Sequence, residues 1–245
     1  KCWGENSSFQ LGTSAIGSST VPTVVDSGTL YSDIASGTEF SCGITTAGVQ
    51  KCWGRLPYFS WVATPTVWDS GTLYSKISAN GNFVCGLTVA GNIRCWGLSA
   101  SSAWITTPTT FDSGTVYTDL SVSYYGRVCG VTSAGVLKCF YSSDTSSITV
   151  VDSGTAYSKV SYAEYGVACG ITTTGVLRCW SGYANTSTIV DAGTAYTMVI
   201  SSNGSQCGIT TAGVMKCWGR EISFSLGSGN YFMLPFNRSV NLETQ

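Results

Sequence analysis

Hydrophobic and polar positions recur in a fixed order along the chain. An apolar run ends in Asp-Ser-Gly-Thr or Asp-Ala-Gly-Thr, a tyrosine follows two residues later, and a stretch with two cysteines comes next. A lysine or arginine precedes the second cysteine, and successive copies of this basic-Cys step lie 50, 43, 44, 40 and 38 residues apart. Units of this size, with about four short strands each, are typical of propeller blades. The pattern predicts an all-β chain of repeated small sheets.

The stretch with two cysteines predicts a β-hairpin. In CGITTAGVQKC, residues 42–52, pairing Thr45 with Val49 leaves a three-residue loop that ends in Gly48. Glycine is favoured there because the last loop residue takes a positive φ. The same register places Cys42 opposite Cys52 at a non-hydrogen-bonded pair, where Cα atoms lie roughly 4.5 Å apart and a disulfide can form. The five expected disulfides are Cys42–Cys52, Cys85–Cys95, Cys129–Cys139, Cys169–Cys179 and Cys207–Cys217.

A metal site is the alternative interpretation of the paired cysteines. Nine residues separate the two cysteines of each pair, which is wider than the usual Cys-x2–4-Cys ligand spacing. The chain has no histidine that could complete a mixed site. It also has no phosphate-binding loop or dinucleotide fingerprint. We therefore expect disulfides, no metal and no cofactor.

Three other residue types repeat with the hairpin. A glycine faces each basic residue, as Gly43 faces Lys51, and we expect the glycine to make room for the basic stem. The repeated aspartates either pair with the basic residues or initiate the Asp-Ser-Gly turn, and the turn is favoured because it needs no partner. The repeated tryptophans either bind sugars or pack between blades, and packing is favoured. The aspartates are Asp26, Asp69, Asp112, Asp152 and Asp191, and the tryptophans are Trp3, Trp53, Trp96, Trp180 and Trp218.

Composition points to a secreted protein. A net charge of −1 gives no overall field that would attract nucleic acid or an anionic membrane. The apolar runs are too short for membrane insertion. Eleven cysteines at regular spacing, together with four glycosylation sequons, indicate an oxidising extracellular compartment and a glycoprotein. The first residues, Lys1-Cys2, look like the start of a processed or truncated product. The sequons begin at Asn6, Asn185, Asn203 and Asn237.

The repeats resemble those of the regulator of chromosome condensation family. The resemblance rests on CWGENSSFQLG at 2–12, on residues 30–54, and on CWGREISFSLGSG at 217–229. It implies an all-β propeller, here with about six short blades in a single domain of residues 1–245. Family propellers usually have seven blades with longer repeats, and the exchange-factor activity that names the family is not carried over.

Cys2 lies on a strand whose hairpin partner is missing from the repeat pattern. Five blades are expected to be complete, and the sixth is completed by the N- and C-terminal segments or by a neighbouring subunit. In the first alternative, which is slightly favoured, part of the tail 220–245, such as Asn237–Thr244, closes the ring. In the second, the tail contacts a neighbour and Cys2 stays unpaired or forms an intermolecular bond.

Candidate chemistry favours binding over catalysis. Without histidine there is no Ser-His-Asp or Cys-His set, so we expect no enzyme. Aromatic residues that break the repeat fall in variable segments, where they either stack on sugars or contact proteins, or else tuck over a blade edge. These candidates are Tyr58, Phe59, Trp61, Trp104, Tyr124, Tyr125, Tyr162 and Tyr165.

The sequence therefore predicts a non-catalytic, extracellular structural or interaction protein. Low charge and disulfide-closed hairpins suit a self-assembling subunit of a surface appendage, coat or matrix. The expected partners are copies of itself, joined head to tail, or glycans. A lectin-like carbohydrate-binding propeller is the first alternative, and an inhibitor of a secreted enzyme is the second.

Overall fold

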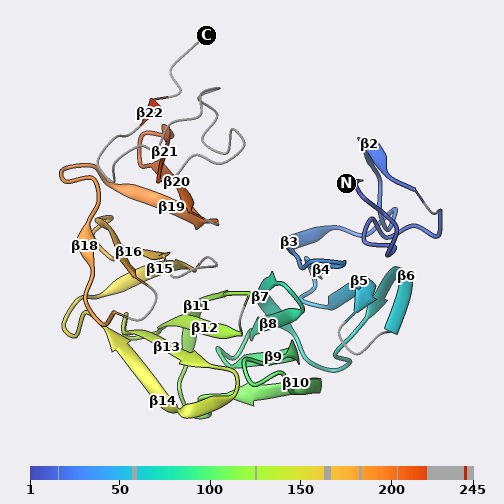
Figure 1. Cartoon of the computed structure of the whole chain (residues 1–245), viewed down its shortest axis with the longest axis horizontal. Helices are drawn as coiled ribbons and strands as arrows, with labels where there is room; N and C mark the ends of the chain where they lie inside the picture. The colour runs from blue at the N-terminus through green and yellow to red at the C-terminus, as the bar shows by residue number, and fades with distance from the viewer. Residues whose placement is uncertain are drawn as a thin grey trace. The chain divides into compact units, whose positions relative to one another are not determined.

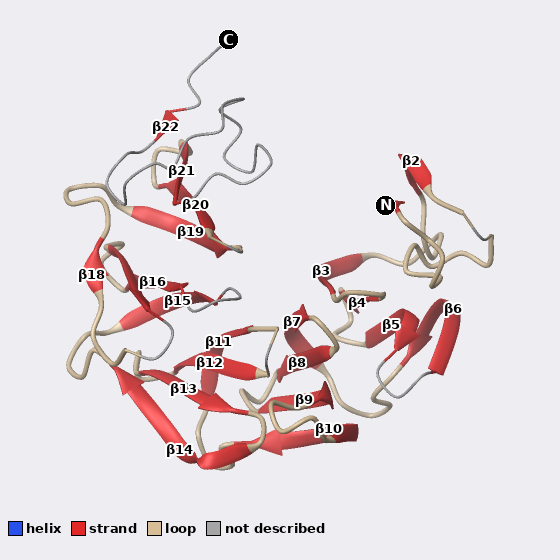
Figure 2. Ribbon diagram, viewed as in Figure 1, coloured by secondary structure: helices blue, strands red, loops and turns tan. Residues whose placement is uncertain are grey.

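The computed structural model describes residues 1–15, 17–56, 60–124, 126–162, 167–181, 184–202, 204–219 and 240–241. All regular secondary structure in these ranges is β-strand, as the repeat pattern predicts (Figure 2). No helix there could span a membrane.

Five antiparallel sheets of four strands follow one another along the chain (Figure 1). In each sheet the four strands lie in sequence order, so every connection inside a sheet joins neighbouring strands. The first sheet has β3 Tyr31–Ser36, β4 Phe40–Thr45, β5 Gln50–Leu56 and β6 Ser60–Val67, and the second has β7 Tyr74–Asn80, β8 Phe83–Thr88, β9 Ile93–Leu98 and β10 Trp104–Phe111. The third has β11 Tyr117–Val122, β12 Arg127–Thr132, β13 Leu137–Tyr141 and β14 Asp144–Val151. The fourth has β15 Tyr157–Tyr162, β16 Val167–Thr172, β17 Leu177–Ser181 and β18 Thr188–Ile189, and the fifth has β19 Tyr196–Ser201, β20 Ser205–Thr210, β21 Met215–Gly219 and β22 Val240–Asn241.

The chain forms two compact units. Unit one comprises Lys1–Val128 with Tyr141–Ser147, and unit two comprises Cys129–Phe140 with Ile148–Gln245. Unit one holds the first two complete sheets, and unit two holds the last two. That residues 1–245 form a single domain stays a prediction.

Each cysteine hairpin has the register that the sequence predicts. In the first sheet Cys42 lies opposite Cys52, and Thr45 N–H donates to Val49 O at 2.9 Å. Gly48 has a φ of 81°, so the loop ends in the left-handed conformation. All five predicted cysteine pairs are disulfide-bonded, with Cα–Cα distances of 4.0–4.1 Å.

The explanation offered for the glycine after each first cysteine is corrected. A Cβ built on Gly43 would lie 2.6 Å from the Tyr31 ring, and one built on Gly86 would lie 2.5 Å from the Tyr74 ring. The glycine therefore makes room for an aromatic ring from the first strand of the sheet, and not for the basic stem of the third strand.

The hydrophobic core lies between successive sheets. In unit one, Phe40 and Leu56 of the first sheet pack with Tyr74, Ile77 and Trp96 of the second. In unit two, one cluster joins residues 129–139 and 151 to the fourth sheet, and a second joins the fourth sheet to the fifth. Burial of each large apolar side chain contributes roughly 1.5–3 kcal/mol.

The two ends of the chain contribute shorter strands. In unit one, β1 (Cys2–Gly4) pairs with β2 (Ser19–Thr23) in a two-stranded sheet. In unit two, β22 pairs with β21, with Val240 opposite Cys217. The described part of the tail thus serves as the fourth strand of the fifth sheet. Closure of a ring by the tail stays a prediction, and Asn237–Ser239 and Leu242–Thr244 lie outside the described residues.

Candidate functional site

A tyrosine, an aspartate and a basic residue form a hydrogen-bonded cluster that recurs from sheet to sheet. Tyr31 Oη donates to Asp26 Oδ2 at 2.6 Å, and Lys51 Nζ donates to the same oxygen at 2.7 Å. Thr29 N–H donates to Asp26 O at 3.0 Å, so the aspartate also begins a turn. Both roles considered for the aspartates are present, which corrects the preference for the turn alone. The equivalent contacts are Tyr74–Asp69, Tyr117–Asp112, Tyr157–Asp152 and Tyr196–Asp191, with ion pairs Arg94–Asp69, Arg178–Asp152 and Lys216–Asp191.

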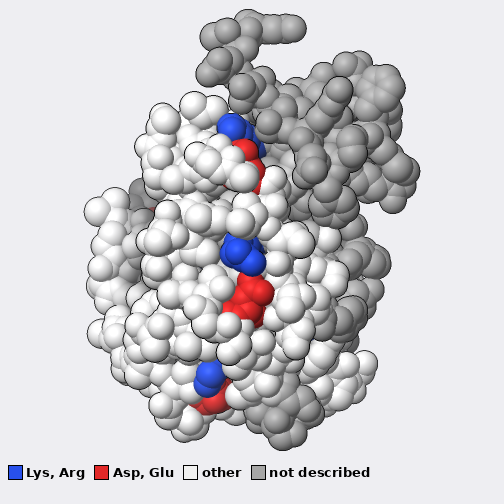
Figure 3. Space-filling model, turned by 90° about the vertical axis from the view of Figure 1, so that its left-hand side faces the viewer, with Lys and Arg blue, Asp and Glu red and all other residues white. Residues whose placement is uncertain are grey.

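Two members of the first cluster have shifted pKa values. Burial alone would raise the pKa of the Asp26 carboxyl, but hydrogen bonds from Lys51 and Tyr31 outweigh burial and lower that pKa. Burial, supported by the hydrogen bond to Asp26, raises the pKa of the Tyr31 phenol above its ordinary value. Figure 3 shows basic and acidic side chains adjacent on a face that is otherwise uncharged. The charges are matched locally, and each cluster ties the turn before a sheet to the first and third strands of that sheet.

The part of the chain that the structure describes contains no group of three or more His, Cys, Asp or Glu side chains that could hold a metal ion.

Four of the five repeated tryptophans pack inside the fold. The exposed fractions of Trp53, Trp96, Trp180 and Trp218 are 1–4%. Trp53, Trp180 and Trp218 each meet the tyrosine of their own sheet edge to face, at centroid distances of 6.2–6.4 Å. Trp3, at the same repeat position, is 62% exposed. The packing role favoured from the sequence fits four of the tryptophans, and Trp3 is the exception.

The exposure of Trp3 follows from the strand pairing of β1. Lys1-Cys2-Trp3-Gly4 is a copy of the third-strand sequence at residues 51–54. A third strand in a complete sheet lies between a second and a fourth strand, whereas β1 pairs with β2 alone among the described residues. β2 has the place of a fourth strand, because it precedes the Asp-Ser-Gly-Thr turn as β6 and β10 do. In the described ranges, no strand pairs with the other edge of β1.

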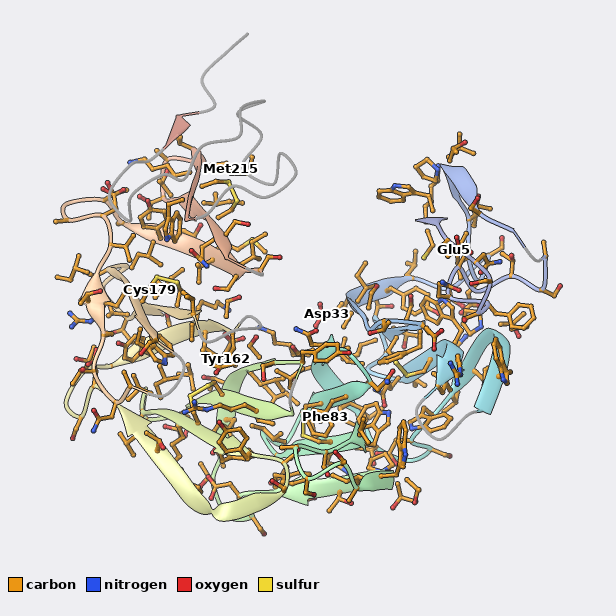
Figure 4. The ribbon with its side chains drawn as sticks, viewed as in Figure 1. Glu5, Asp33, Phe83, Tyr162, Cys179 and Met215 are labelled. Carbon is orange, nitrogen blue, oxygen red and sulfur yellow. A yellow bond between two sulfur atoms is a disulfide. The ribbon has the colours of Figure 1, made fainter. Side chains whose placement is uncertain are left out.

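A second residue is exposed beside this edge. Ile34 on β3 is 68% exposed, although the residues at its repeat position are buried. A cavity of about 420 Å³ lies against the edge, with Cys2, Trp3, Ile34 and Phe40 in its lining. Figure 4 labels Glu5, which follows β1, and Asp33 on β3. The buried equivalents of Ile34 are Ile77, Leu120, Val160 and Val199. We call the surface formed by Cys2, Trp3 and Ile34 the β1 edge site.

Cys2 is the cysteine that has no disulfide in the described chain. Burial raises the pKa of its thiol above the ordinary value, and the positive charge of the N-terminus only partly offsets this. The structure brings Cys2, which the sequence singled out, together with Trp3 and Ile34, whose site role the sequence analysis missed. The available signal was the alignment of Ile34 with its repeat equivalents, together with the lack of a hairpin partner for Cys2 in the repeat pattern.

The predicted binding aromatics are scattered, and they differ in exposure. Trp61 on β6 is 54% exposed, with the Phe9 ring at a centroid distance of 6.0 Å and the Arg55 guanidinium 5.6 Å from its ring. Tyr124 is exposed and Trp104 is half-buried. Tyr162 is buried in the core of unit two, which assigns it to packing. Tyr58, Phe59, Tyr125 and Tyr165 lie outside the described residues.

The sequon asparagines also differ. Asn6 is 1% exposed, and its Nδ2 donates to Ala15 O while its Oδ1 accepts from Leu11 N–H at 2.8 Å. This burial argues against a glycan there, because attachment would require the loop to open. Asn185 is exposed, and glycosylation at this residue stays a prediction. Asn203 and Asn237 lie outside the described residues.

Comparison with known proteins gives the fold. No family model and no curated protein matches the sequence. Human WBSCR16 is similar in structure, with a TM-score of 0.78, 13% identity, and coverage of 99% of this chain and 75% of that one. Yeast RCC1 (Prp20), solved with bound Kap60, has a TM-score of 0.75 at 13% identity and coverage of 93% and 67%. The ectodomain of the Physcomitrella patens receptor kinase CR4 has a TM-score of 0.56 at 19% identity and coverage of 84% and 54%. The resemblance in the repeats is thus matched in three dimensions, and this chain has the β-propeller fold of the RCC1-repeat proteins.

Proposed function

We propose that this chain is an extracellular, non-catalytic interaction protein and that the β1 edge site accepts an added β-strand. The observation that carries the proposal is the exposure of Trp3 and Ile34 at repeat positions that are buried elsewhere in the chain. An open strand edge beside exposed apolar side chains suits strand addition, in which main-chain hydrogen bonds supply affinity and side-chain pockets supply specificity.

The disulfides support an extracellular setting. Five bonded cysteine pairs suit an oxidising compartment. A similar fold forms the CR4 ectodomain, and the Prp20 structure contains a bound protein, Kap60. Peptide mapping of the protein from its source, without reduction, tests the compartment. Five bonded pairs are expected, and reduced thiols at these positions would contradict the proposal.

Selection from a random-peptide display library tests binding at the site. Peptides selected on the intact protein should lose binding to Trp3→Lys, because a charged side chain at the edge opposes strand addition. Trp61→Lys is the matched control, since Trp61 is similarly exposed but lies on β6 and does not line the cavity beside β1. If no peptide is selected, or if the selected peptides bind Trp3→Lys as well as the unmodified protein, the proposal fails.

Assembly from copies of the chain remains a prediction. Sedimentation velocity at rising concentration tests it, because head-to-tail contacts give species that grow with concentration. A single monomeric species at all concentrations would contradict the prediction that copies of the chain assemble. Inhibition of a secreted enzyme also remains a prediction.

Glycan binding is a second candidate function. The exposed Trp61 ring, held by Phe9 and Arg55, offers an aromatic face of the kind that stacks on sugars. A glycan array should show binding by the intact protein that Trp61→Ala abolishes and Trp3→Lys leaves unchanged. Absence of binding to all glycans would remove this candidate.

A further inference from the structure

We infer that the first sheet binds a neutral pyranose sugar at Trp61, with the apolar face of the sugar on the tryptophan ring and its hydroxyls donating to the Glu39 carboxylate. The inference rests on glycan binding, the second candidate function, and names the class of sugar. We call the group formed by Phe9, Glu39, Arg55 and Trp61 the Trp61 site. All of these residues belong to unit one.

Strand pairing places the aromatic ring beside a cation. β5 and β6 lie side by side (Figure 1), and Arg55 on β5 is directly opposite Trp61 on β6. The guanidinium carbon of Arg55 lies 5.6 Å from the centroid of the Trp61 ring, within the range of a cation–π contact. The tryptophan nevertheless stays 54% exposed. Aromatic surface therefore remains on which the C–H face of a sugar ring can stack.

A carboxylate balances the charge of this cation. Arg55 Nη1 donates to Glu39 Oε2 at 2.7 Å, and Arg55 N–H donates to Glu39 O at 2.8 Å. The other carboxylate oxygen, Glu39 Oε1, accepts from Ser8 Oγ at 3.5 Å, which is the outer limit of a hydrogen bond. The Glu39 side chain is 37% exposed. An ionised carboxylate has about four lone-pair positions, so Glu39 can accept further hydrogen bonds from a ligand.

The loop that carries Phe9 is held in a strained conformation beside the tryptophan. Phe9 has a φ of 60°, in the left-handed region that residues other than glycine seldom adopt. Its ring meets Trp61 edge to face, at a centroid distance of 6.0 Å. The next residue fixes the loop, because Gln10 O accepts from Trp53 Nε1 at 2.9 Å and from Ser41 Oγ at 3.0 Å. Strained backbone that its surroundings hold in place is typical of binding sites.

Charge selects the class of ligand. The positive charge of Arg55 beside the ring opposes a cationic ligand, which would otherwise stack on an exposed tryptophan. The negative charge of Glu39 opposes an anionic ligand, such as a sugar that carries a carboxylate or a sulfate. An uncharged ligand with an apolar face and hydroxyl donors suits both residues, and a neutral pyranose has these features.

The second sheet holds uncharged residues at the corresponding positions. Leu98 and Trp104 lie opposite each other there, as Arg55 and Trp61 do in the first sheet. Asn82 O accepts from Leu98 N–H at 2.9 Å, which gives Asn82 the place of the carboxylate residue in the ion pair. The same backbone therefore accepts leucine and asparagine at the two charged positions, and a variant can borrow them.

A glycan array with a series of protein concentrations tests the inference on the whole chain. The array carries neutral tetrasaccharides of glucose, galactose and mannose, the tetramer of galacturonic acid and the tetramer of glucosamine. The half-saturating protein concentration is measured for each sugar, and calorimetry checks that each variant is folded.

We expect the intact protein to bind a neutral tetrasaccharide more tightly than either charged tetramer. Trp61→Ala should abolish this binding, whereas Val67→Ala should leave it unchanged, because Val67 is an exposed apolar residue on the same strand but outside the Trp61 site. Glu39→Gln removes the negative charge and keeps the side-chain shape, so the preference for the neutral sugar over the galacturonic acid tetramer should fall about ten-fold.

The double variant Arg55→Leu with Glu39→Asn gives the first sheet the residues of the second. It should bind the neutral sugar about ten-fold more weakly than the intact protein does. If this variant does not fold, Glu39→Gln carries the test by itself.

Tighter binding of a charged tetramer than of every neutral one would overturn the inference and leave glycan binding as a candidate. An unchanged preference in Glu39→Gln would also overturn it, because the carboxylate would then play no part in recognition. If Trp61→Ala binds as the intact protein does, or if no sugar binds, the inference and the glycan candidate both fall. Strand addition at the β1 edge site is tested separately by peptide selection and is unaffected by these results.

Discussion

Gly86→Ala should destabilise the second sheet through the ring of Tyr74. A Cβ at residue 86 would lie 2.5 Å from Cδ1 and Cε1 of this ring. The ring is 1% exposed, and its Oη donates to Asp69 Oδ2 at 2.5 Å, so it cannot move aside without losing that bond. Overpacking costs about 1–3 kcal/mol and loss of a hydrogen bond to a charged group about 1.5–3 kcal/mol. We expect a total of about 3 kcal/mol, because the ring relieves part of the clash when it moves.

Calorimetry with the disulfides intact measures this effect. For a chain of this length, about 3 kcal/mol lowers Tm by roughly 6–12 °C. Tyr74→Phe removes the hydroxyl that tethers the ring, so Gly86→Ala should cost about 1–2 kcal/mol less in that background. Amide exchange in β7 and β8 should rise in Gly86→Ala more than in the other sheets. A cost within about 0.5 kcal/mol of zero, or the same cost in both backgrounds, would refute the role assigned to the tyrosine ring.

Three further predictions concern stability. Replacing Cys85 and Cys95 together with alanine should cost about 2–3 kcal/mol in calorimetry, because the disulfide closes a short loop; an unchanged Tm under oxidising conditions would contradict this. Lys76→Met should cost about 3 kcal/mol, because it leaves the buried Asp119 carboxylate without this cation, and adding Asp119→Leu should recover most of the loss. Burial, together with the hydrogen bond to Asp152, raises the pKa of the Tyr157 phenol from 10.0 to about 12. The stability that the protonated phenol contributes is therefore complete below pH 10 and is lost as pH rises through about 12. Tyrosinate absorbance during alkaline titration checks this, and unfolding that precedes tyrosine ionisation would argue against it.

The hairpins were predictable because their geometry is local. The loop glycine, the register and the distance between Cys42 and Cys52 all follow from eleven consecutive residues. The reason for Gly43 was not predictable in this way, because the Tyr31 ring arrives from a third strand. The ion pair between Lys51 and Asp26 was not predictable either, because it depends on how the turn before the first strand folds back over the sheet.

The candidate site was predictable only in part. Counting repeats identified Cys2 as the cysteine without a hairpin partner. Exposure of Trp3 was missed because the tryptophans were interpreted as one set with one environment. Ile34 was missed because its repeat position is apolar in every sheet, and only the neighbouring first strand decides whether it is buried. Sequence position alone also placed Tyr162 among exposed loop aromatics, although its strand turns the ring into the core.

The five disulfides each join cysteines that are ten residues apart in the sequence. When the two termini of the chain are pulled apart, each intact disulfide therefore keeps about 33–36 Å of chain from being stretched out. Because every bond lies within one sheet, tension can still separate one sheet from the next. The protein would then lengthen in limited steps under load, and each sheet would keep its two central strands joined and ready to reform when the load is released.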